Sequence, residues 1–152
     1  MDQRQLPVDF KEFLELLNSN DVQYLLIGGW AVGFHGYSRF TADMDIFIGL
    51  SEENISSMKQ ALHEFGVPEF DRSMLTTKGN VFRIGRAPLR IEVINEISGV
   101  DFDDAFSNRE FFELEDQLRI PIISLDDLLK NKSSTGRAKD KADLEELRKF
   151  LG

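Results

Sequence analysis

The sequence contains no cysteine, and this absence excludes several classes of protein. Without cysteine there is no disulfide framework, no thiolate zinc site and no thiol nucleophile. Proline is also scarce, with 4 residues in 152, and tryptophan occurs once. Stability therefore has to come from an ordinary hydrophobic core, for which 13 phenylalanines and a hydrophobic content of 41% supply the material.

Positive charge is in the minority. The 18 Lys and Arg residues face 27 Asp and Glu residues, which gives a formal net charge of −9. Broad, sequence-independent binding to nucleic acid or to an anionic membrane needs clustered positive charge, so the composition disfavours both. A local basic patch is still compatible with it.

Long apolar runs are absent as well. The longest segment without a charged side chain, residues 22–38, is interrupted by four glycines, whereas a membrane helix needs about 20 apolar residues. The first ten residues lack the basic and then apolar stretch of a signal peptide. We therefore expect no membrane association, a cytoplasmic protein, and one domain over residues 1–152.

Hydrophobic periodicity predicts helices and strands in alternation. Asp9 and Ser51 are predicted to cap helices at the N-terminus and Gly66 to cap one at the C-terminus. Segments 71–78 and 132–136 are predicted to be mobile loops. The expected helices are 9–17, 30–36, 52–65, 101–106, 125–132 and 139–151, and the expected strands are 22–27, 41–49, 81–84, 89–94 and a pair within 111–123.

Two aspartates carry the first chemical signal. Asp43 and Asp45 are two residues apart on a predicted strand, so their side chains leave the same face. Neighbouring carboxylates repel one another, and a divalent cation resolves that conflict. Mg²⁺ is commonly held by one or two carboxylates together with phosphate oxygens of a substrate. The pair therefore indicates a metal site that handles phosphate.

A diglycine supplies a second signal. Gly28 and Gly29 follow an apolar strand and precede a helix. Backbone amides at such a turn can hold phosphate oxygens, and the start of the helix favours negative charge. Many strand-to-helix turns contain glycine, however, so the motif alone is equally consistent with a structural turn.

Glu92 is the candidate for a third carboxylate, which a two-metal arrangement requires. Leu89, Ile91 and Val93 share one face of the strand at 89–94, so Glu92 points to the other face. We expect that face to be shared with Asp43 and Asp45. The alternative is an ordinary polar residue on the solvent side of a strand.

These motifs resemble a known signature. The diglycine followed by Arg39-Phe40-Thr41-Ala42-Asp43-Met44-Asp45 is similar to that of the nucleotidyltransferase superfamily, whose catalytic fold is of the DNA polymerase beta type. The nearer likeness is to small bacterial nucleotidyltransferase-like proteins, including the abortive-infection and toxin–antitoxin types. Their C-terminal part is similar to residues 132–144, and the likeness extends from about Val22 to Leu147.

The resemblance implies an α/β (α+β) fold in which helices flank a mixed β-sheet. It also implies a nucleoside triphosphate, Mg²⁺ or Mn²⁺, and transfer of a nucleoside monophosphate to an acceptor hydroxyl or phosphate. The acceptor is not named by the sequence, and RNA and protein are candidates, as are an antitoxin-like partner and a homodimer. By residue, the implied metal ligands and catalytic groups are Asp43, Asp45 and Glu92, and the implied nucleotide contacts are Gly28, Gly29, Arg39 and Thr41. Glu92 departs from the Asp that the family usually has at that position.

Several cations fit two interpretations. Lys132 and Lys139 either reach the triphosphate or belong to a solvated helix, on which Lys139 and Asp143 would pair at the surface. Three arginines near Glu92 are also open to two interpretations: they either attract phosphate or simply face solvent. They are Arg83, Arg86 and Arg90.

Three functional hypotheses follow. The first is an active nucleotidyltransferase. The second is a nucleotide-binding or partner-binding module without catalysis on the same fold, favoured by the short chain and by Glu at the third acidic position. The third is another enzyme with an Asp-x-Asp motif, such as a haloacid dehalogenase type phosphatase or a glycosyltransferase. The order of residues around Asp43 and Asp45 is wrong for the phosphatase, and the glycosyltransferases usually have larger domains.

Overall fold

A six-stranded sheet forms the centre of the molecule in a computed structural model that describes residues 7–36, 43–86, 89–114 and 117–149. In order across the sheet the strands are β3 (Val81–Arg86), β4 (Leu89–Ile94), β2 (Asp43–Ile48), β1 (Tyr24–Ile27), β6 (Arg119–Ile122) and β5 (Glu110–Glu113). Parallel pairs join β2 to β4 and β1 to β6, while the other neighbours are antiparallel. The predicted mixed sheet is therefore confirmed.

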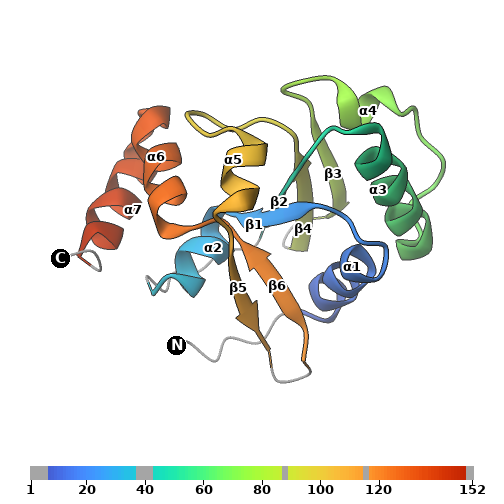
Figure 1. Cartoon of the computed structure of the whole chain (residues 1–152), viewed down its shortest axis with the longest axis horizontal. Coiled ribbons are helices and arrows are strands. Elements are labelled where there is room, and N and C mark those ends of the chain that lie inside the picture. Colours follow the sequence, from blue (N-terminus) through green and yellow to red (C-terminus); the bar gives the residue numbers. More distant parts are fainter. Residues whose placement is uncertain (1–6, 37–42, 87–88, 115–116, 150–152) are drawn as a thin grey trace.

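Helices cover this sheet from two sides (Figure 1). In the view of Figure 1, α1 and α3 lie together at the right, and α6 and α7 lie together at the left. The full set is α1 (Val8–Ser19), α2 (Gly28–Phe34), α3 (Glu52–Phe65), α4 (Ser73–Thr76), α5 (Phe102–Ser107), α6 (Leu125–Thr135) and α7 (Ala138–Arg148).

The core follows the predicted hydrophobic pattern. All four residues of β1 are buried. Along β2, Met44 and Ile46 are fully buried, whereas Asp43 and Asp45 are half-buried on the opposite face. The apolar faces of α1 and α3 pack on the buried side through residues such as Phe13. The sheet therefore has one face that is all core and another that presents carboxylates.

Two of the three predicted helix caps are observed. The Ser51 side chain accepts a hydrogen bond from the Asn54 amide at 3.1 Å, and Gly66 adopts the left-handed conformation that ends α3. The prediction for Asp9 was wrong, because α1 begins at Val8 and Pro7 precedes it. Asp9 instead lies in the first turn, where its charge suits the helix dipole.

Two predicted loops contain helix. Residues 73–76 form the short α4, and most of segment 132–136 is the last turn of α6. The polar composition of 132–136 was misleading because its lysine is buried in an ion cluster, described below. Within the described part of the chain, no helix combines the length and the apolar content needed to cross a bilayer.

Candidate active site

The parallel pairing of β2 with β4 places the acidic residues together. In this register Asp45 lies opposite Glu92, and Asp43 lies opposite Arg90. The carboxyl groups of Asp45 and Glu92 share a side-chain hydrogen bond, and the charge of Asp43 acts on Asp45 as well. The expected placement of Glu92 on the face of Asp43 and Asp45 is thus observed, while the functions of the three residues stay predictions.

Gly28 brings the main chain against this carboxylate pair. It opens α2 directly after β1, and its φ of +69° lies in the left-handed region that favours glycine. A Cβ atom at this position would overlap Oδ2 of Asp45. Only glycine therefore allows the start of α2 to lie this close to the Asp45 carboxylate.

Asp45 is held in an environment that disfavours its charge. Burial raises its pKa to about 7, and the Glu92 charge, the shared hydrogen bond and the Asp43 charge act in the same direction. Lys139, near the start of α7, opposes them. One oxygen, Oδ1, is buried and accepts no hydrogen bond from the described residues. Among the described residues, the ionised form of Asp45 is therefore only partly compensated.

Glu92 has a cation beside it. The Arg83 guanidinium on β3 donates from Nε to Glu92 Oε2 at 2.7 Å, and the two residues face one another across the antiparallel β3–β4 pair. The Arg83 side chain is 59% exposed, so this contact can open at little cost.

Lys132 lies in a buried ion cluster between α6 and α7. Its Nζ is 2.8 Å from Asp140 Oδ1 and 3.2 Å from Asp143 Oδ2, and the three side chains are at most 4% exposed. Thr135 and Arg137 also donate to Asp140. Burial alone would raise the pKa of Asp140, but these hydrogen bonds and the Lys132 charge hold it at about 2. The expected solvated surface pair of Asp143 with Lys139 was wrong, because Asp143 points inward to Lys132.

The profile of one sequence family matches almost the whole chain. This family is described as nucleotidyl transferase of unknown function (DUF2204), and the match covers residues 8–152. The chain belongs to this nucleotidyl transferase family. No curated protein matches it in sequence.

Solved nucleotidyltransferase structures share the fold of this nucleotidyl transferase family member. A protein of Thermotoga maritima assigned as a nucleotidyltransferase has a TM-score of 0.60 and 21% identity, over 93% of this chain and 89% of its own. The lincosamide antibiotic adenylyltransferase LnuA, with lincomycin bound, has a TM-score of 0.60 and 18% identity, over 94% and 96%. ANT(2″)-Ia, in complex with adenylyl-2″-tobramycin, has a TM-score of 0.56 and 14% identity, over 94% and 87%. At these identities the similarity shows the fold alone.

The donor set fits a divalent cation in part. Asp43, Asp45 and Glu92 offer carboxylate oxygens from two adjacent strands, and the buried Asp45 Oδ1 accepts no hydrogen bond from the described residues. As they stand, no three Asp, Glu or His side chains of the described residues are grouped closely enough to hold one ion. Glu92 would have to release Arg83 and its hydrogen bond with Asp45 before it could join the two aspartates.

The other predicted site residues have different surroundings. Gly29 is buried in the first turn of α2. The predicted phosphate contacts Arg39 and Thr41 lie outside the described residues, and so does the Arg86 side chain. His35, which is not among the predicted site residues, makes a structural contact, since its Nε2 hydrogen-bonds the Ile123 carbonyl at 2.8 Å.

The ion cluster and the Arg83–Glu92 pair were not anticipated from the sequence. One available signal was the i,i+3 spacing of Asp140 and Asp143, which places both on one side of a helix. The partner strand of Arg83 could be read only from the hairpin register.

Proposed function

We propose that this chain transfers a nucleoside monophosphate from a nucleoside triphosphate, ATP in the first instance, to an acceptor hydroxyl with Mg²⁺ or Mn²⁺. One observation carries the proposal: Asp45 and Glu92 meet across β2 and β4 directly beside the glycine that opens α2. A strained acidic pair next to a helix start suits a substrate that brings both a cation and phosphates.

Asp43 and Asp45 would hold the metal, and Glu92 would complete the ligand set. When bound, the cation would neutralise phosphate charge and lower the pKa of the attacking hydroxyl. The backbone amides of Gly28 and Gly29 would hold the triphosphate, together with Arg39 and Thr41, which precede β2 in the sequence.

In the transfer itself, the acceptor oxygen would form a bond to the α-phosphorus while the bond from that phosphorus to the bridging oxygen breaks. Pyrophosphate leaves with the electron pair, and the hydroxyl proton passes to solvent. The protein would act mainly by position and by charge, since its own groups form no covalent intermediate.

The two lysines predicted to contact the nucleotide differ in their exposure to solvent. Lys139 is exposed and already acts electrostatically on Asp45, so it can turn toward a triphosphate. Lys132 is enclosed by Asp140 and Asp143, so its contribution would be to hold α7, and Lys139 with it, beside the carboxylates.

The acceptor is proposed to be a small molecule. LnuA and ANT(2″)-Ia, whose structures contain lincomycin and adenylyl-tobramycin, support this over RNA or protein. A partner protein or a second copy of the chain remains the alternative source of an acceptor surface.

A binding module without catalysis is the second candidate. The observation that favours it is the Arg83–Glu92 contact of 2.7 Å, which already neutralises the third carboxylate. In that case the chain would bind a nucleotide through Asp43 and Asp45 but leave it unchanged.

The decisive experiment measures transfer from α-labelled ATP to a panel of small hydroxyl compounds, with Mg²⁺, with Mn²⁺ and with EDTA. Asp43→Ala and Glu92→Ala should each abolish metal-dependent transfer. Glu145→Gln, which removes an exposed carboxylate from α7, is the matched control and should retain activity. Equilibrium binding of MnATP to the same variants separates the candidates. Binding without transfer to any acceptor supports the module, and absence of both rejects the two together.

A further inference from the structure

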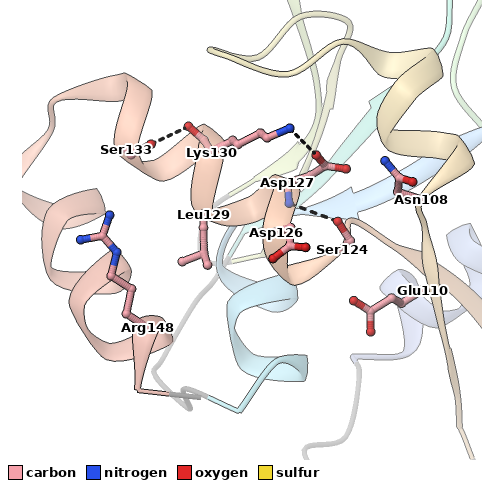
Figure 2. Close-up of a pocket in the computed structure, with 9 residues that line it drawn as sticks. All are labelled: Asn108, Glu110, Ser124, Asp126, Asp127, Leu129, Lys130, Ser133 and Arg148. Carbon is pink, nitrogen blue, oxygen red and sulfur yellow. Dashed lines mark hydrogen bonds and ion pairs between the residues drawn. The ribbon is translucent and has the colours of Figure 1, made fainter. Parts of the chain in front are cut away.

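A cavity lies where α6 begins. It has a volume of about 750 Å³. Its walls come from the N-terminal half of α6, the start of β5 and the last turn of α7, where Arg148 is located. Figure 2 shows Glu110 and Asp126 pointing toward the same space, with Arg148 on the far side.

Asp127 is the most unusual group in this cavity. The residue is 5% exposed, and its Oδ2 atom is buried with no hydrogen-bond partner in the described residues. The paired cation, Lys130 Nζ, is 3.8 Å from the other oxygen and belongs to a side chain that is 68% exposed. Burying a carboxylate oxygen without a hydrogen bond costs free energy of folding. A ligand that donates a hydrogen bond to Asp127 would remove this cost.

The other acidic groups define the ligand's charge. Glu110 Oε2 accepts from the Leu125 amide at 3.2 Å, which fixes Glu110 at the start of α6. With Asp126 and Asp127 the cavity holds three carboxylates against two cations, Lys130 and Arg148. This balance favours a cationic group on the ligand. Since no three acidic or histidine side chains of the described residues are arranged to hold a metal ion, an organic ammonium fits better than a metal.

The strand that leads to this cavity, β6, lies two strands from β2, which carries Asp45. Leu26 pairs with Ile122 on β6, and the neighbouring Ile27 pairs with Asp45. Ser124, which lines the cavity, is the second residue after β6 and caps α6. Asp45 and the end of β6 are therefore separated by two strand spacings, about 10 Å. A small molecule can span that distance.

We propose that this cavity binds an organic ammonium group through Asp127, and that it holds an amine-bearing acceptor with its hydroxyl directed to the carboxylate pair. The second part rests on the proposed transferase function. The cavity would thus select acceptors by an amine remote from the reacting oxygen.

The test compares 4-amino-1-butanol with 1,4-butanediol, which has a hydroxyl in place of the ammonium. Titrations of the ¹⁵N-labelled protein without nucleotide should show amide shifts within residues 124–133 for the amine and none for the diol. Asp127→Asn preserves the shape of the side chain and should weaken amine binding about tenfold. Glu110→Gln provides a second variant, and Glu145→Gln is the control that should bind as the unmodified protein does.

Equal shifts with the diol, unchanged affinity in Asp127→Asn, or shifts spread over exposed acidic residues elsewhere would each overturn the ammonium site. In the transfer assay, Asp127→Asn should raise KM for 4-amino-1-butanol about tenfold and leave kcat unchanged. An unchanged KM would overturn the acceptor assignment. Absence of any transfer, with amine binding as expected, would reject the transferase function and the acceptor assignment while the ammonium site stands.

Discussion

At the scale of single residues, Asp45 is the group whose negative charge is most disfavoured by its surroundings in the site. Its carboxylate lies beside Glu92 and Asp43, and one of its oxygens is buried without a hydrogen-bond donor among the described residues. Such an arrangement costs stability when the group is ionised. This repulsion between carboxylates would favour the binding of a cation, because the cation would remove the unfavourable interaction.

Asp45→Asn should stabilise the metal-free protein at alkaline pH. The folded pKa of Asp45, about 7, lies above its unfolded value of 3.8, so its stabilising contribution is present below pH 4 and is lost as the pH rises through 7. Asn resembles the neutral acid and can donate to Glu92. We expect a gain on the order of 2 kcal/mol in the free energy of unfolding above the folded pKa, and little change below pH 4, where the group is protonated in both the folded and the unfolded state.

Urea denaturation at the two pH values, with EDTA present, measures this effect. Glu145→Gln should show no comparable dependence on pH, because that side chain is exposed. A loss of stability in Asp45→Asn at alkaline pH would contradict the electrostatic description of the site.

Gly28 permits a second prediction at this scale. Gly28→Ala introduces a Cβ at a φ of +69° and into contact with Asp45. Gly136→Ala is a matched control, since Gly136 has a φ of +73° and has no atom within 4 Å of an added Cβ. Both should lose about 1 kcal/mol through the backbone, and Gly28→Ala should lose about 1–3 kcal/mol more through the clash. Thermal unfolding of the two variants measures the difference, and equal losses would show that α2 moves freely away from Asp45.

At the scale of elements, the α6–α7 pair is joined by the cluster of Lys132, Asp140 and Asp143. The cluster is almost completely buried, so the attraction between its opposite charges is strong, and removing one of them would leave a buried charge uncompensated. Its position also sets where α7 begins, and hence where Lys139 lies relative to Asp45.

Lys132→Met should therefore destabilise the protein by about 3–5 kcal/mol, because Asp140 and Asp143 would both lose the buried cation that lies between them. Lys130→Met on the same helix removes a lysine that is 68% exposed and should cost less than about 1 kcal/mol. Chemical denaturation of both variants provides the measurement. The triple variant Lys132→Met, Asp140→Asn, Asp143→Asn should recover part of the loss, and no recovery would indicate that packing rather than charge holds the two helices.

At the scale of the whole molecule, the net charge of −9 opposes binding of free ATP. We expect Mg²⁺ and ATP together to stabilise the chain by about 2.7 kcal/mol at 100 times the dissociation constant, which corresponds to roughly 5–10 °C in the melting temperature. ATP without metal should have little effect. Differential scanning fluorimetry tests this, with Asp43→Ala as the variant that should lose the shift. A full shift with ATP in EDTA would contradict the assignment of the carboxylates.

Much of the architecture was predictable from local patterns. The apolar run of β1, the alternation along β2 and the spacing in α3 reflect periodicities that the chain itself carries. The sequence did not indicate Asn54, whose side chain accepts from the Gln23 amide at 2.7 Å and donates to the Gly49 carbonyl at 2.8 Å. This residue ties the approach to β1 to the end of β2, and a buried polar residue of this kind has the same local pattern as an exposed one.

The sequence by itself determined the alternation of elements, the shared face of Asp43 and Asp45, and the glycine turn before α2, because each depends on residues close along the chain. Only the tertiary structure decided that Glu92 meets Asp45, that Arg83 neutralises Glu92, and that Lys132 is enclosed by Asp140 and Asp143. These contacts depend on which strands and helices become neighbours. That choice is made by the burial of the whole core, and a charged residue does not reveal through its local pattern whether its partner is water or another buried charge.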